Sequence, residues 1–156
     1  MIKRLDHISV VIEDLPAAIA FFTALGMELE GRAEVGGPTV DRLNGIQGVH
    51  AEIVMLRTPD GHGKLELTKF RNPKLVEIRP AVAPPNALGL RSVMFAVDDL
   101  DEAVERLRRE GGELVQYEEA YRLCYMRGPG GIIVALAEDC RPGAPPRRAP
   151  TTPTPQ

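Results

Sequence analysis

The chain contains two copies of one sequence pattern, and this repetition limits the folds that are open to it. The segment HISVVIEDLPAAIAFFTALGMEL begins at position 7, and SVMFAVDDLDEAVERLRREGGEL begins at position 92. The same offset of 85 residues aligns them without a gap, so that Asp14 falls on Asp99 and Gly26 falls on Gly111. A repeat of this kind predicts two copies of one structural unit.

Each copy predicts a strand, a helix and then three further strands. An apolar run comes first, and an acidic residue, Asp14 or Asp99, then serves as the N-cap of an amphipathic helix. Gly26 and Gly111 end these helices. A strand near residues 27–35 and a hairpin around turn residues 59–61 complete the first copy, and residues 128–131 form the matching turn of the second.

These boundaries predict a first module over residues 1–70 and a second module over residues 90–140. Residues 71–89, between them, are rich in proline and are predicted to be a linker. Residues 141–156, RPGAPPRRAPTTPTPQ, lack hydrophobic periodicity and cannot bury enough apolar surface to offset the entropy of ordering. We therefore expect them to form a disordered tail.

The tail leads to a first testable prediction. A chain that ends at Cys140 should unfold at the same temperature as the full chain, because the composition of residues 141–156 provides no core contacts. Thermal unfolding followed by circular dichroism measures this. A large drop in the midpoint would show that the tail packs on the body.

Composition and charge exclude several classes of partner. With 19 basic and 22 acidic side chains the net charge is −3, and no basic stripe is present to neutralise phosphates, so we expect no nucleic-acid partner. No apolar run approaches the roughly 20 residues that span a bilayer, and the start of the chain does not resemble a secretory signal. These patterns favour a cytoplasmic protein with a small organic ligand and no membrane partner; a homodimer is left open.

Four segments together resemble the vicinal-oxygen-chelate superfamily, the glyoxalase and bleomycin-resistance fold. They are DHISVVIEDLPAAIAFF, RTPDGHGKLEL, FAVDDLDEAVERL and RGPGGIIVALAE. The resemblance implies an α+β fold in which two paired βαβββ modules form a cupped mixed sheet around a ligand cavity. It does not assign a reaction, because one fold supports many kinds of chemistry.

The resemblance also implies where a metal would bind. In members of the superfamily that hold a divalent metal, the ligands come from the first and last strands of each module. Carried onto this chain, the first module supplies His7 and Glu66, whereas the second has Ser92 and Ala135 at the matching positions. Two ligands fall short of the three that a catalytic metal usually takes. We expect no cofactor, with a weakly held divalent metal left open.

The alternation of side chains along the strands predicts which residues share the ligand face. The polar wall comes from the first module and the apolar wall from the second, joined by two residues near the last hairpin. The predicted ligand-binding residues are His7, Ser9, Glu66, Thr68, Ser92, Met94, Arg122, Cys124 and Ala135.

Two hypotheses for function follow from this set. The first is a small-molecule-binding protein, similar to antibiotic-sequestering members of the superfamily, that holds an organic ligand without a complete metal site. The alternative is an isomerase, epimerase or lyase in which Glu66 or His7 is the catalytic proton shuttle. An ordinary structural role for both residues, as a hydrogen-bonded histidine and a paired carboxylate, is also open. The sequence does not decide whether the protein is an enzyme.

Overall fold

The computed structural model describes residues 1–119 and 122–139, which form two βαβββ modules. The first module consists of β1 (Ile8–Val11), α1 (Leu15–Ala24), β2 (Glu28–Gly36), α2 (Pro38–Asn44), β3 (His50–Arg57) and β4 (Lys64–Asn72). The second consists of β5 (Ser92–Val97), α3 (Leu100–Arg109), β6 (Glu113–Glu118), β7 (Leu123–Arg127), the short 3-10 helix η1 (Pro129–Gly131) and β8 (Ile133–Glu138). The predicted α+β class and the paired modules are confirmed.

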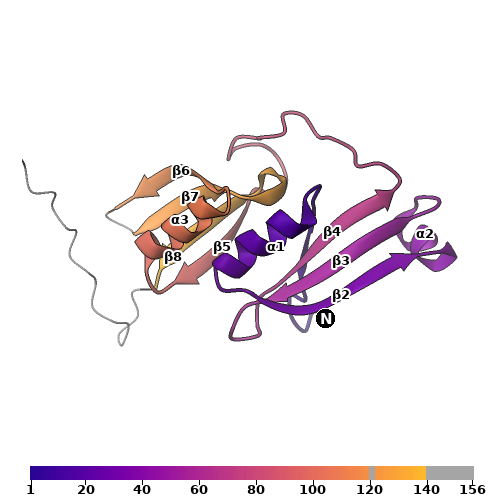
Figure 1. Ribbon diagram of the computed structural model, residues 1–156, viewed down its shortest axis with the longest axis horizontal. Helices are drawn as coiled ribbons and strands as arrows, with labels where there is room; N and C mark the ends of the chain where they lie inside the picture. Colours follow the sequence, from indigo (N-terminus) through magenta and orange to yellow (C-terminus); the bar gives the residue numbers. More distant parts are fainter. Residues whose placement is uncertain (120–121, 140–156) are drawn as a thin grey trace, which may run out of the picture.

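Each module has its own four-stranded mixed sheet. The strand orders are β1-β4-β3-β2 and β5-β8-β7-β6, so the same topology occurs twice. The first and last strands of each module pair in parallel, and the other neighbours are antiparallel. In Figure 1 the sheet of the first module extends to one side of the molecule and that of the second module extends to the other.

The two long helices begin and end at the predicted residues. The carboxylate of Asp14 accepts a hydrogen bond from the backbone N–H of Ala17, and Asp99 accepts one from the N–H of Glu102 in the same way. Such N-caps satisfy donors that the first turn of a helix leaves unpaired. Gly26 adopts a φ of 111° just beyond α1, a conformation that favours glycine.

One hydrophobic core joins the two modules. It contains side chains from both long helices and from the helix-facing sides of both sheets. Phe21 of α1 is 1% exposed, and a Cβ at Gly112 or Gly128 of the second module would lie 2.9 or 3.2 Å from its ring. The neighbouring Phe22 ring lies 6.5 Å from that of Phe95 on β5. The modules therefore pack against each other within the chain.

Several features differ from the predicted boundaries or lie beyond them. The sequence analysis did not predict α2, which starts at Pro38 and ends at Gly45 in a left-handed conformation. Strand β4 continues to Asn72, two residues past the predicted end of the module. The predictions for residues 141–156 and for Cys140 concern a segment outside the described residues. No helix in the described ranges is long and apolar enough to cross a membrane.

Candidate functional site

The side of each sheet that faces away from the helices, here called the open face, carries most of the predicted site residues. On the first sheet, Ser9 of β1 pairs with Glu66 of β4. On the second sheet, Met94 of β5 pairs with Ala135 of β8. Met94 lies 85 residues after Ser9, so the strand registers place Glu66 and Ala135 at equivalent positions of the two modules, in agreement with the sequence alignment.

The carboxylate of Glu66 is the centre of a polar cluster on the first open face. Its Oε1 accepts hydrogen bonds from Ser9 Oγ at 2.9 Å and from Thr68 Oγ1 at 3.0 Å. Its Oε2 lies 3.7 Å from His7 Nε2. The side chain of Glu66 is 20% exposed and that of His7 is 35% exposed. The structure therefore brings together four of the predicted site residues, with an edge of the carboxylate and the imidazole still accessible.

A second carboxylate lies behind the histidine. Asp6 Oδ2 is 3.0 Å from His7 Nδ1, and Arg4 Nη2 donates to Asp6 Oδ1 at 2.8 Å. The contacts of His7 and Arg4 lower the pKa of Asp6 to about 2, so Asp6 is ionised at neutral pH. A carboxylate on Nδ1 favours the tautomer in which Nδ1 carries the proton and Nε2 faces the site. Sequence reasoning missed Asp6, although its position next to His7 was a signal.

The residues around this cluster on β3 are apolar. Met55 pairs with Glu66 and Ile53 pairs with Thr68, and both are partly buried. Cross-strand partners point to the same side of a sheet, so these two side chains lie beside the carboxylate. Lys64, at the other end of the face, is paired with Glu30 at 2.7 Å. The open face thus offers a few polar groups in apolar surroundings, which is typical of small-molecule sites.

The second open face has no ionisable side chain at the positions equivalent to His7, Ser9 and Glu66. Met94 is 57% exposed, Ser92 is exposed, and Ala135 is fully buried. Ser92 and Met94 can therefore contact a ligand directly, whereas Ala135 provides only space beneath them. Around Ala135 the second open face therefore lacks the carboxylate and imidazole of the first module.

Two residues of the predicted ligand-binding set point to the other side of the sheet. Cys124 is 1% exposed within the hydrophobic core, and burial raises the pKa of its thiol to about 11. Arg122 lies in a turn with a φ of 50° and donates to Glu138 and to Asp101 of α3. Cys124 therefore lies in the core and Arg122 in an ion-paired turn, away from the polar cluster, and their role in ligand binding stays a prediction.

The donor set does not fit a catalytic divalent metal. On the first module the imidazole of His7 and the carboxylate of Glu66 are suitable ligands, but Ser92 and Ala135 supply neither on the second. Within residues 1–119 and 122–139, no three histidine, cysteine, aspartate or glutamate side chains gather closely enough to hold a metal ion. In addition, Glu66 Oε1 already accepts hydrogen bonds from two hydroxyl groups, those of Ser9 and Thr68. We therefore derive no chemistry through a metal.

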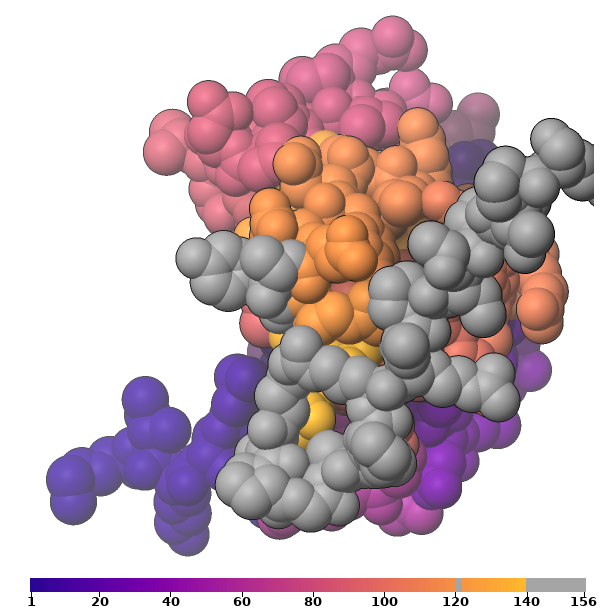
Figure 2. Space-filling view, turned by 90° about the vertical axis from the view of Figure 1, so that its left-hand side faces the viewer, coloured from indigo at the N-terminus to yellow at the C-terminus, as the bar shows by residue number. Residues whose placement is uncertain are grey.

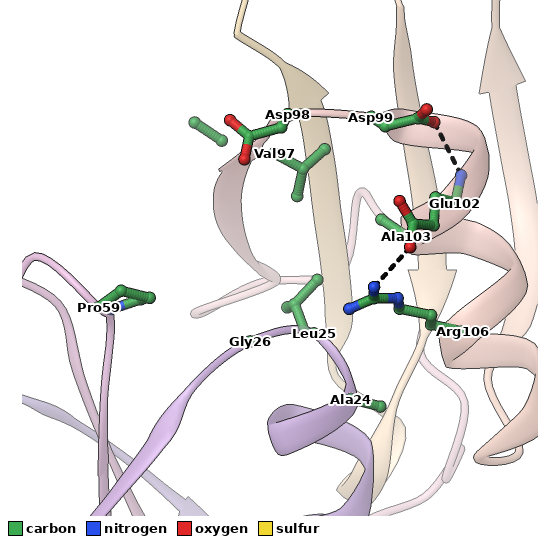
Figure 3. A pocket seen from close by; sticks show the side chains of 11 residues that line it. Ala24, Leu25, Gly26, Pro59, Val97, Asp98, Asp99, Glu102, Ala103 and Arg106 are labelled. Carbon is green, nitrogen blue, oxygen red and sulfur yellow. Dashed lines mark hydrogen bonds and ion pairs between the residues drawn. The ribbon is translucent and has the colours of Figure 1, made fainter.

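A cavity of about 350 Å³ lies at the junction of the modules, away from the polar cluster (Figure 3). The end of α1, the turn at Pro59 and the start of α3 line it. Three of its four charged groups are used within α3, because Arg106 pairs with Glu102 and Asp99 caps the helix; Asp98 is the fourth. This location differs from the predicted ligand cavity, and most of its charged groups are already used in the structure of α3.

Comparisons with known proteins agree with the fold. The model of the glyoxalase/bleomycin resistance protein/dioxygenase superfamily matches residues 4–135. A glyoxalase family protein from Bacillus cereus is 47% identical, with a TM-score of 0.80 over 88% of this chain and 95% of that one. No curated protein shows significant similarity to the chain.

More distant structures share the fold alone. Glyoxalase I of Leishmania major, described as trypanothione-dependent, is 20% identical with a TM-score of 0.64, covering 88% of this chain and 87% of its own. The fosfomycin resistance protein FosX of Listeria monocytogenes, solved with Mn(II), is 16% identical with a TM-score of 0.54, covering 88% and 93%.

Proposed function

The chain belongs to the glyoxalase/bleomycin resistance protein/dioxygenase superfamily, and we propose that it binds a small organic molecule on its open faces without a complete metal site. The observation that carries this proposal is the environment of Glu66. Two hydroxyl groups and the imidazole of His7 surround the carboxylate, and part of it remains accessible. Such a group can accept a hydrogen bond from a ligand whose apolar part rests on the neighbouring Met55 and Ile53.

The energetics favour a role for Glu66 beyond sheet stability. A carboxylate placed among apolar side chains costs free energy unless hydrogen bonds compensate for the lost water. The hydroxyls of Ser9 and Thr68 supply part of this compensation, and both donate to the same oxygen. The second oxygen has only the longer contact of 3.7 Å with His7 Nε2. A ligand that donates a hydrogen bond to Oε2 would complete the compensation.

The test compares two glutamates on opposite sides of one sheet. Glu66→Gln keeps the shape of the side chain but removes its charge, and should weaken binding by about 1.5–3 kcal/mol, the range for a hydrogen bond to a charged group. Glu34→Gln is the control, because Glu34 pairs across the strands with Glu52 on the helix-facing side and is largely exposed. Compounds that raise the unfolding temperature of the wild-type protein would be titrated calorimetrically into both variants. Equal affinities for the two variants would exclude the open face as the site.

The arrangement of Asp6, His7 and Glu66 supports enzymatic proton transfer as a second candidate function. Asp6 contacts Nδ1 of the histidine, and Glu66 lies near Nε2, so the imidazole lies between two carboxylates. A histidine held in this way can take or return a proton at Nε2. If a substrate is found, His7→Gln should then lower the turnover rate and leave its affinity nearly unchanged, which is the pattern of a group that acts in the transition state. Loss of affinity alone would favour the binding function.

A further inference from the structure

Several charged side chains that are buried at least in part are paired with opposite charges. Glu52 lies between Arg32 and Arg71, at 2.6 and 2.7 Å, and these two guanidinium groups hold the pKa of the Glu52 carboxyl below its usual value. Arg122 pairs with Glu138. Among residues 1–119 and 122–139, Arg127 and Arg91 are partly buried arginines without a carboxylate partner.

Arg127 is on the open face of the second sheet. It pairs across the strands with Ile133, which in turn pairs with Ser92, so Arg127, Ile133 and Ser92 form one row on that face. The guanidinium donates to two neutral acceptors, the backbone carbonyl of Gly131 at 3.0 Å and that of Ala83 at 2.7 Å. Its positive charge is therefore solvated by dipoles and is not neutralised.

The equivalent arginine of the first module provides an internal comparison. Arg57 ends β3 as Arg127 ends β7, and it faces Glu28 across the strands as Arg127 faces Glu113. Arg57 donates to Glu28 Oε2 twice, at 3.0 and 3.2 Å. Within the described ranges, Arg127 makes no such bond to Glu113. The same position is thus neutralised in one module and left positive in the other.

Arg91 adds a second positive charge at this end of the sheet. It directly precedes β5, and its backbone carbonyl accepts a hydrogen bond from the N–H of Ile133. The Nε of Arg91 is buried and has no hydrogen-bond partner. The linker lies along the same end, as the contact between Arg127 and Ala83 shows, and in Figure 2 it covers the top of the second module. A buried guanidinium donor without an acceptor costs free energy.

From this charge pattern, and resting on the proposed function, we propose that the ligand carries an anionic group, such as a carboxylate, sulfonate or phosphonate, that Arg127 recognises. The planar guanidinium suits such oxyanions because it can donate two parallel hydrogen bonds. The apolar part of the ligand then lies toward Met94. The substrate class is an amphipathic organic anion.

The test uses two dyes that differ by one sulfonate group and hence in charge. 8-Anilinonaphthalene-1-sulfonate is an aromatic anion, and N-phenyl-1-naphthylamine has the same ring system without the sulfonate. Fluorescence titration of the full chain gives both affinities. Arg127→Gln should weaken binding of the sulfonate about tenfold or more, as expected for loss of a charge-assisted hydrogen bond, and should leave binding of the uncharged dye unchanged. Arg127→Lys, which keeps the charge, should restore part of the affinity.

Arg57→Gln is the matched control, because it removes the same charge from the equivalent position of the other module. It should change neither affinity. The proposal is overturned if Arg127→Gln weakens both dyes equally, since Arg127 would then only hold the linker, or if Arg57→Gln weakens the sulfonate as much, since the effect would then be one of net charge. If the wild-type protein binds neither dye, the proposed function itself fails and this inference fails with it.

Discussion

Replacement of Phe21 by alanine should lower the free energy of unfolding by about 3–5 kcal/mol, the range for removal of a buried aromatic ring. Phe21 is 1% exposed and lies against two glycines of the second module, Gly112 and Gly128, so its loss opens a cavity where the modules meet. The surrounding backbone is held by both sheets and can close that cavity only in part. Chemical denaturation followed by circular dichroism measures the change.

The control for Phe21→Ala is Leu43→Ala on α2, because Leu43 is 86% exposed and contributes nothing to the shared core. It should alter the free energy of unfolding by less than about 0.5 kcal/mol. Because one core joins the modules, the wild-type chain should also unfold in a single transition. Two transitions, or a small effect of Phe21→Ala, would show that each module is stable by itself.

The double change Ser92→His with Ala135→Glu should create a binding site for a divalent metal. The strand registers place these positions at the equivalents of His7 and Glu66, so the variant would offer two imidazoles and two carboxylates. Metal at about 100 times its dissociation constant stabilises a protein by about 2.7 kcal/mol, which corresponds to a rise of roughly 5–10 °C in unfolding temperature for a chain of this size. Differential scanning fluorimetry with and without Zn²⁺ or Mn²⁺ measures the shift.

Each single change is a control for the double variant. Ser92→His or Ala135→Glu alone should give a smaller metal-dependent shift, because three donors hold the ion less tightly than four. The wild-type protein, with two donors, should show the smallest shift. An equal response of the wild-type protein and the double variant would mean that the metal binds elsewhere in the chain.

Most of the fold could be predicted from the sequence repeat and from the residues that cap the two long helices. Asp14 and Asp99 cap their helices as predicted, because a short carboxylate side chain just before a helix can accept a hydrogen bond from a free backbone N–H of the first turn. The equivalence of the Glu66 and Ala135 positions could also be anticipated, since the first and last strands have the same register in both modules. Helix α2 was missed because its seven residues carry no apolar stripe, although Pro38 and Gly45 mark its two ends.

The positions of Arg122 and Cys124 could not be predicted from the sequence because they depend on the exact start of β7. A left-handed residue, Arg122, precedes the strand and sets which side chains face the helices. Cys124 then pairs with Leu136 in the core, and Tyr125 pairs with Ala135 on the open face. A shift of one residue would exchange the two faces, and no local pattern in this segment distinguishes the two registers.

Native mass spectrometry of the purified protein tests the central proposal most directly, because it detects an organic ligand and a metal ion in one spectrum. We expect the wild-type chain to carry a small organic molecule that a chelator does not remove, and Glu66→Gln to purify with much less of it. Metal should be far below one ion per chain, since His7 and Glu66 alone cannot complete a coordination shell. One tightly held metal ion per wild-type chain, or an organic ligand that is lost on chelation, would contradict the account.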